Sequence, residues 1–242
     1  MPSLTLPDRL IWFAHVPKAG GTSIETALVA RWGCQVGHLH WGWDRWWRQG
    51  GWRVADPPNS PQHLIWADAQ SLLPRAPDAV FALVRDPAAR LASEYRYQRH
   101  ARRGTCFGRA LAYLPFPLWL RLMLAMVAHH PHTFDNHLRP QADFVPDHAK
   151  IFRLEDGLVP VADWLAAATG TAIPEMPHAL KSGPHTPITI ALQARIEAAY
   201  SEDYDRFGYA RSDLSLPQET VLDRLANTLA PILVWLDRRG RL

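Results

Sequence analysis

Short runs of apolar residues alternate along this chain with longer segments of helical periodicity. Two such runs lie at residues 10–14 (LIWFA) and 80–84 (VFALV), and residues 150–154 (KIFRL) are a third strand candidate. Runs of this length, rich in aliphatic and aromatic residues, are typical of strands buried in a parallel sheet. We therefore expect three strands at these positions.

The segments between and after these runs have the spacing and the boundary residues of helices. The predicted helices span residues 24–31, 67–73, 88–102, 118–128, 161–168, 188–200 and 220–237, the last within an amphipathic C-terminal stretch at about 217–238. Pro87 stands where the third of them would begin, a favoured position for proline. Alternating strands and helices predict an α/β fold with a central, mostly parallel sheet.

Composition narrows the class of protein. The chain has 242 residues, of which 48% are hydrophobic and 20% charged, so we expect one globular domain spanning residues 1–242. A net charge of +3 is too small to indicate a nucleic-acid partner but suits an anionic ligand. The sequence shows neither a secretory leader nor a membrane span, and Cys34 and Cys106 match no metal or redox spacing, which predicts a cytoplasmic protein.

The most informative stretch is HVPKAGGTSI, residues 15–24, between the first strand and the first helix. Free N–H groups and the dipole at a helix start attract anions, and Gly20 and Gly21 allow a ligand to approach the backbone closely. Thr22 and Ser23 add hydroxyl donors. Lys18 adds charge, in a chain whose 26 basic residues include only three lysines. This loop therefore predicts a site for a phosphate or sulfate group.

The loop differs from the P-loop of ATP-hydrolysing enzymes. That motif places its lysine after the glycines, whereas Lys18 precedes them. The strand at 80–84 is followed by Arg85 rather than by an acidic residue that would hold Mg²⁺. A nucleotide or phosphate kinase stays open as an alternative but is disfavoured.

A second candidate anion site lies in RDPAARLASEY, residues 85–95. Arg85 follows the strand at 80–84, and ligands of open α/β sheets bind beyond the carboxyl ends of strands. Ser93 is two helical turns further on, so that a guanidinium and a hydroxyl would bind one phosphate. The alternative is that Arg85 pairs with Asp86 or Glu94 and that Ser93 only packs.

Together, HVPKAGGTS and LVRDPAARLASEY resemble the nucleotide-binding motifs of sulfotransferases that use 3′-phosphoadenosine-5′-phosphosulfate (PAPS). The likeness is closest to Golgi-type carbohydrate sulfotransferases and their bacterial relatives, sulfotransferase family 2, and the absence of an anchor favours a bacterial-type member. Weaker likeness extends it over about residues 10–210. It implies a P-loop-NTPase-like three-layer sandwich, and a metal-free reaction that leaves adenosine 3′,5′-bisphosphate.

The resemblance also implies roles for individual residues. Lys18 would neutralise charge on the leaving phosphate, and the 5′-phosphate would be held by Ala19, Gly20, Gly21, Thr22 and Ser23, with alanine where the family often has threonine. Arg85 and Ser93 would hold the 3′-phosphate. Lys181, Ser182 and Gly183 resemble the late loop that covers the nucleotide in this family.

Transfer to a hydroxyl requires a base, and several residues are candidates. His63 precedes the strand at 80–84 at a distance similar to that of the catalytic histidine of uronyl 2-O-sulfotransferases, although Pro61 replaces their other histidine. His38 and His40 would share one face of a strand. The remaining candidates are Glu25 and His137, the latter with Arg139 and Gln141 as acceptor contacts.

The tryptophans and arginines within residues 41–66 suit a glycan acceptor, because aromatic rings stack on sugars. The alternative is that these tryptophans form a small core of their own. A third reading of the whole chain is a binding module that retains the nucleotide site and has no base.

Overall fold

The computed structural model describes residues 2–37, 61–70, 73, 75–101, 110–111, 113–173, 176, 186–212 and 214–238. The chain divides into two compact units, which are described separately below. The first unit comprises Met1–Arg85 and Gln141–Lys181, and the second comprises Asp86–Pro140 and Ser182–Leu242. The single domain expected for residues 1–242 stays a prediction.

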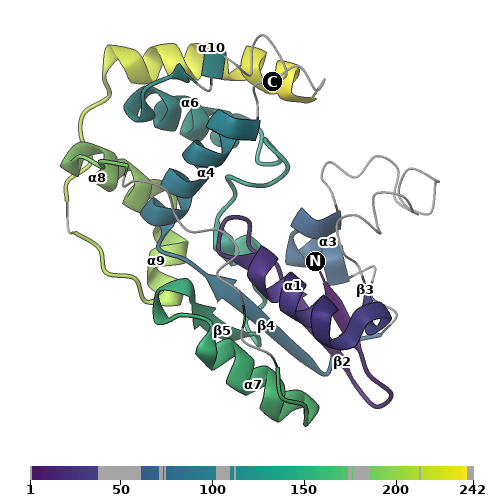
Figure 1. The fold of residues 1–242 in the computed structure, drawn as a ribbon. Coiled ribbons are helices and arrows are strands. Elements are labelled where there is room, and N and C mark those ends of the chain that lie inside the picture. The colour runs from purple at the N-terminus through teal and green to yellow at the C-terminus, as the bar shows by residue number, and fades with distance from the viewer. Residues whose placement is uncertain are drawn as a thin grey trace. The chain divides into compact units, whose positions relative to one another are not determined.

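The first unit is built on a five-stranded sheet in the order β3-β1-β2-β4-β5 (Figure 1). The strands are β1 (Ser3–Thr5), β2 (Leu10–Ala14), β3 (Val36–Gly37), β4 (Ala79–Val84) and β5 (Lys150–Arg153). β2, β4 and β5 are parallel, with Phe13 opposite Phe81 and Leu83 opposite Phe152. Only β1 runs antiparallel to its neighbours, which confirms the predicted α/β class with a mostly parallel sheet.

One face of this sheet is covered by two helices, α1 (Gly21–Trp32) and α7 (Val159–Thr169). Every residue of β2 is buried, as expected of an interior parallel strand. Its alternate side chains Ile11 and Phe13 join the hydrophobic cluster that contains residues of both helices. The three-layer arrangement expected from the resemblance stays a prediction.

Short elements account for most differences from the predicted pattern. Of the helix expected at 67–73, the described residues include α3 (Trp66–Ala69), and 3-10 helices in the described part of the chain lie at Gly33–Gln35, Pro61–His63, Gln141–Asp143 and Leu154–Asp156. β1, β3 and α9 (Ser201–Phe207) were not predicted. Elements of two to seven residues are too short to show a periodicity.

The second unit contains helices only, among the residues that the structure describes. Its helices are α4 (Pro87–Ala101), α6 (Phe116–His129), α8 (Ile190–Ala199), α9 and α10 (Val221–Arg238). Apart from α9, which was not predicted, each of them begins and ends within two residues of a predicted helix, and α4 begins at Pro87 as expected.

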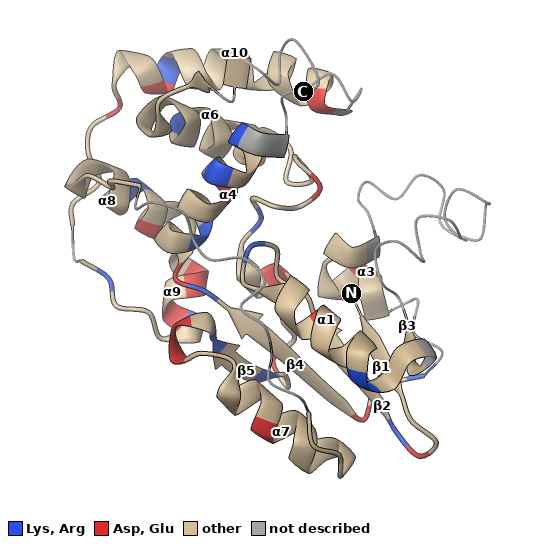
Figure 2. Ribbon diagram, in the orientation of Figure 1, with Lys and Arg blue, Asp and Glu red and all other residues tan. Residues whose placement is uncertain are grey.

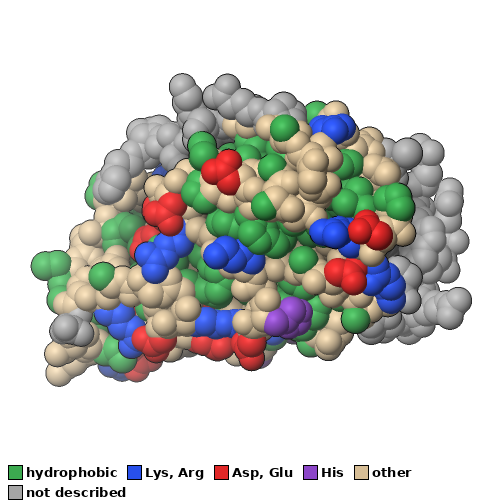
Figure 3. Space-filling model, turned by 90° about the horizontal axis from the view of Figure 1, so that it is seen from below, with side chains coloured by type: hydrophobic (Ala, Val, Ile, Leu, Met, Phe, Trp, Pro, Cys, Tyr) green, Lys and Arg blue, Asp and Glu red, His purple; other side chains and the backbone are tan. Residues whose placement is uncertain are grey.

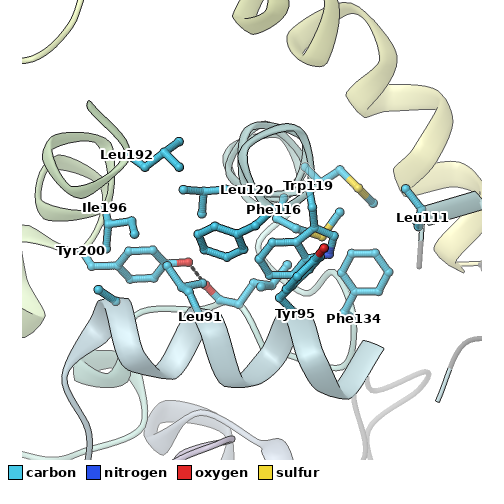
Figure 4. Close-up of a cluster of buried hydrophobic side chains, with 14 of the residues drawn as sticks. Leu91, Tyr95, Leu111, Phe116, Trp119, Leu120, Phe134, Leu192, Ile196 and Tyr200 are labelled. Carbon is cyan, nitrogen blue, oxygen red and sulfur yellow. Dashed lines mark hydrogen bonds between the residues drawn. The ribbon is translucent and has the colours of Figure 1, made fainter. Parts of the chain in front are cut away.

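The core of the second unit is aromatic and aliphatic (Figure 4). Trp119 and Leu120 of α6 are 0% exposed, and Tyr95 of α4 packs against the Trp119 ring. From α10, Ala230 and Val234 join the same cluster, whereas Leu225 lies on an exposed face of that helix. The second unit therefore has a core of its own.

Acidic and basic residues are distributed over both units, and α4 and α9 each carry residues of both signs (Figure 2). On the face drawn in Figure 3, acidic and basic side chains are interspersed with hydrophobic ones. Within the described residues, no helix has both the length and the hydrophobicity that crossing a bilayer requires.

We predict that Leu120→Ala lowers the free energy of unfolding by about 2–5 kcal/mol, because it opens a cavity in a closed core. The matched change Leu225→Ala, on a side chain that is 52% exposed, should stay within about 0.5 kcal/mol of wild type. Urea unfolding of the two variants measures the difference. Equal losses would contradict the assignment of the core.

Candidate functional site

The loop between β2 and α1 has the backbone of an anion cradle. Lys18 and Gly20 adopt left-handed conformations, with φ of 66° and 92°, and Ala19 lies between them. Alternation of this kind turns successive N–H groups toward a common point. The Ala19 side chain is buried, whereas Lys18 is half-buried.

The start of α1 adds to the positive potential at this loop. Gly20 caps the helix and has no side chain with which to accept from its first N–H groups. Residues 21–24 include no acidic side chain, so the positive end of the helix dipole is not neutralised within its first turn. Thr22 is exposed and Ser23 is buried. These features fit a phosphate or sulfate group.

Arg85 is brought to this loop by the sheet. It follows β4, the parallel neighbour of β2, and its Nη1 donates a hydrogen bond of 3.4 Å to the backbone oxygen of Lys18. Gln141 holds Arg85 from the other side, accepting from its N–H at 2.9 Å and donating to its carbonyl at 2.8 Å. Gln141 is 0% exposed and clamps the backbone of Arg85, and its expected contact with the acceptor stays a prediction.

A buried pair that the sequence analysis missed lies beside the loop. His15 Nδ1 is 2.6 Å from Glu25 Oε1, and both side chains are less than a tenth exposed. Burial by itself would raise the pKa of Glu25, but the hydrogen bond and the charge of His15 outweigh it and lower this pKa. In the sequence, this pair was indicated only by the residue types of His15 and Glu25 and by their positions on either side of the two glycines.

His63 belongs to the same group. It ends the 3-10 helix at residues 61–63, is 6% exposed, and its ring lies edge-on to His15 at 5.5 Å between centroids. His15 in turn lies against Gly21, where an added Cβ would come within 2.7 Å of the ring atoms Cε1 and Nε2. The structure thus brings the predicted base His63 close to the predicted donor loop.

The segment before His137 in the second unit has an unusual backbone. Phe134, Asp135 and Asn136 are all left-handed, with φ of 52°, 56° and 62°. Aspartate and asparagine tolerate this conformation, but for a residue such as Phe134 it costs about 1–3 kcal/mol and persists only where surrounding contacts impose it. Here the turn is closed by the N–H of His137, which donates to the Phe134 carbonyl at 3.1 Å.

This backbone is imposed by one side chain of α4, one of α10 and that of Tyr200, the residue between α8 and α9. The buried Arg90 of α4 donates to the carbonyls of His137 and Arg139 at 2.9 and 2.6 Å. The Tyr200 hydroxyl, marked by the dashed line in Figure 4, donates to the Leu138 carbonyl at 2.6 Å. From α10, Asp237 accepts from the N–H of Phe134 at 2.8 Å. Residues 134–139 are therefore held in one conformation.

His137 itself is paired with a buried carboxylate. Its Nδ1 is 2.8 Å from Oε2 of Glu94, which is 2% exposed. The other oxygen of Glu94 accepts from Gln98 at 2.8 Å, and Gln98 accepts from Trp119 Nε1 at 3.0 Å. The ring of Tyr97 stacks on that of His137 at 5.5 Å. Arg90 and Glu94, both within RDPAARLASEY, thus support His137, a role that the sequence did not reveal.

Other predicted residues are placed less closely. Ser93 is half-buried in α4 of the second unit, and its partnership with Arg85 stays a prediction. Arg139 is half-buried two residues after His137. His38, His40, Lys181, Ser182, Gly183 and most of the tryptophan-rich stretch lie outside the described residues.

Comparison with known proteins identifies the family. Residues 2–210 match the model of the Sulfotransferase family. Searches of curated proteins and of solved structures returned no match. Because the match covers most of the chain, this protein belongs to the sulfotransferase family, and its class of reaction is sulfuryl transfer.

We predict that Gly21→Ala destabilises the protein. In an open helix position this change would stabilise by about 1 kcal/mol, but here the new Cβ would overlap the His15 ring. We therefore expect Gly21→Ala to lower the free energy of unfolding rather than to raise it. Thermal unfolding measures it, with the change Thr26→Ala at an exposed position of α1 as the control. A higher melting temperature for Gly21→Ala would contradict the packing of His15.

A second prediction concerns pH. The pKa of Glu25 is lower in the folded protein than its ordinary value of 4.5, so its stabilisation is complete above that value and is lost as the pH falls through the folded pKa. The difference in unfolding free energy between wild type and Glu25→Gln should therefore shrink below about pH 4.5. Urea unfolding from pH 7 to pH 3 tests this, and the exposed Glu155→Gln should show a smaller difference throughout.

Proposed function

We propose that this protein transfers the sulfuryl group of PAPS to a hydroxyl group of an acceptor, most simply a carbohydrate. The observation that carries the proposal is the junction of two cationic residues at neighbouring strand ends. Arg85 at the end of β4 reaches the backbone of Lys18 in the loop that follows β2. A donor with phosphates at both ends of its ribose requires two such anion sites.

The residues of the first unit fit the donor. Gly20, Gly21, Thr22 and Ser23 would hold the 5′-phosphate at the start of α1, and Arg85 would hold the 3′-phosphate. The glycines are necessary here because Gly20 is left-handed and Gly21 lies against the His15 ring. PAPS, when bound, supplies an activated sulfuryl group.

In the reaction, the acceptor oxygen forms a bond to sulfur while the bond from sulfur to the 5′-phosphate oxygen breaks. Negative charge develops on that phosphate oxygen, and Lys18 would stabilise it. The acceptor proton passes to a base, for which the described candidates are His63 and Glu25 in the first unit and His137 in the second. Because Lys18 and Arg85 supply positive charge, we propose that the transfer needs no metal.

The carbohydrate acceptor rests on the aromatic residues. Trp66 is the described member of the tryptophan-rich stretch, half-buried with its ring edge-on to His148 at 5.6 Å. Tyr97 of α4 is 46% exposed and presents an aromatic ring beside His137. Aromatic rings in such positions suit the apolar faces of sugars.

Calorimetric titration with adenosine 3′,5′-bisphosphate tests the donor site directly. We expect binding in the presence of EDTA, and weaker or no binding of ATP with Mg²⁺. Binding of ATP and Mg²⁺ alone would favour a kinase. Binding of the bisphosphate without sulfate transfer to any glycan would favour a binding module.

The variants separate the two cationic residues. Arg85→Ala should weaken bisphosphate binding by about 10-fold or more, since a charged hydrogen bond contributes about 1.5–3 kcal/mol. Lys18→Ala should mainly lower turnover of ³⁵S-labelled PAPS. Arg224→Ala and Lys150→Ala, which change exposed residues, are the matched controls. Unchanged turnover in Lys18→Ala would contradict the role of the loop.

A further inference from the structure

We propose that His137 is the base that takes the proton of the acceptor hydroxyl, and that Glu94 is the residue that positions it. This inference rests on the proposed function and adds the acceptor side of the reaction to it.

Glu94 determines which nitrogen of His137 carries the hydrogen. In its ionised form the Glu94 carboxylate only accepts hydrogen bonds, and in that form the contact of 2.8 Å places the hydrogen of a neutral His137 imidazole on Nδ1. The lone pair is then on Nε2, where a proton can be received. The Glu94 carboxylate is itself oriented by Gln98, which is hydrogen-bonded to Trp119 in the core.

The backbone that leads to His137 has an unusual conformation. Three successive left-handed residues precede it, and none of them is glycine. Arg90 of α4, Asp237 of α10 and Tyr200, between α8 and α9, hold this segment. Strained backbone that is held by many contacts is typical of functional sites, because the contacts fix a side chain where chemistry needs it. Here the side chain that follows the strained residues is His137.

His137 and His15 are both paired with a glutamate, but their rings have different surroundings. The Nε2 edge of the His15 ring faces Gly21, at the first residue of α1. His137 instead lies beside Tyr97, whose side chain is 46% exposed, and between the half-buried Asp135 and Arg139. Tyr97 offers a ring on which a sugar can stack next to the histidine. We infer that Tyr97 belongs to the acceptor subsite.

The step is a proton transfer coupled to sulfuryl transfer. The hydroxyl proton of the acceptor passes to Nε2 of His137 as its oxygen forms the bond to sulfur, and the bond between sulfur and the phosphate oxygen breaks. The imidazolium that forms is stabilised by the negative charge of Glu94. After the product leaves, the proton is released to water.

Transfer kinetics test the base. With ³⁵S-labelled PAPS and desulfated chondroitin, heparosan and alginate as probes, His137→Ala should lower kcat by 100-fold or more with KM for PAPS within about threefold. His63→Ala tests the other candidate base in the same assay. His129→Ala, at an exposed position of α6, is the control. Loss of kcat in His63→Ala with full kcat in His137→Ala would overturn the proposal.

A spectroscopic measurement tests the same proposal without an acceptor. In long-range ¹H–¹⁵N spectra at pH 8, His137, assigned by its loss in His137→Gln, should have its hydrogen on Nδ1. In Glu94→Gln the population with hydrogen on Nε2 should rise. A wild-type His137 with its hydrogen on Nε2 would overturn the proposal.

Bisphosphate titration separates the two levels of inference. If the donor assignment is correct, His137→Ala should bind adenosine 3′,5′-bisphosphate as wild type does. Failure of wild type to bind would remove the proposed function itself. Normal binding together with normal kcat in His137→Ala would remove only the role of His137.

Discussion

Parallel pairing of β2 with β4 determines where the cationic groups of the first unit lie. The carboxyl ends of parallel neighbours meet at one edge of a sheet, so the loop after Ala14 and the residue after Val84 emerge side by side. The bond from Arg85 to the Lys18 carbonyl and the clamp from Gln141 then follow from this placement. An antiparallel pairing would place the same residues at opposite edges.

Buried polar groups are the second organising feature, and each described pair solves the same problem. A carboxylate removed from water is costly unless it is hydrogen-bonded. Glu25 is paired with His15 in the first unit, and Glu94 with His137 in the second. Because both glutamates are covered by protein, each pair also fixes the orientation of an imidazole. One hydrogen bond therefore both gives the buried carboxylate a partner and orients the histidine ring.

The motif RDPAARLASEY performs more than one task because it crosses from strand to helix. Arg85 leaves β4 and meets the loop of the first unit. Arg90 and Glu94, four residues apart, share a face of α4 and hold the segment that carries His137. The family resemblance indicated roles for Arg85 and Ser93. It left the roles of Arg90 and Glu94 open.

The sequence by itself determined the α/β class, the strands at 10–14 and 80–84, the long helices and the loop around Lys18, because these depend on local periodicity and on glycine and proline at their ends. It did not reveal the two-residue β3 or the short α9, which have too few residues for a period. Tertiary structure alone decided which histidine meets which glutamate, since His137 and Glu94 are 43 residues apart. It also decided the left-handed turn at Phe134, because no local preference favours φ above zero for phenylalanine, and the contacts that impose it come from residues as distant as Asp237.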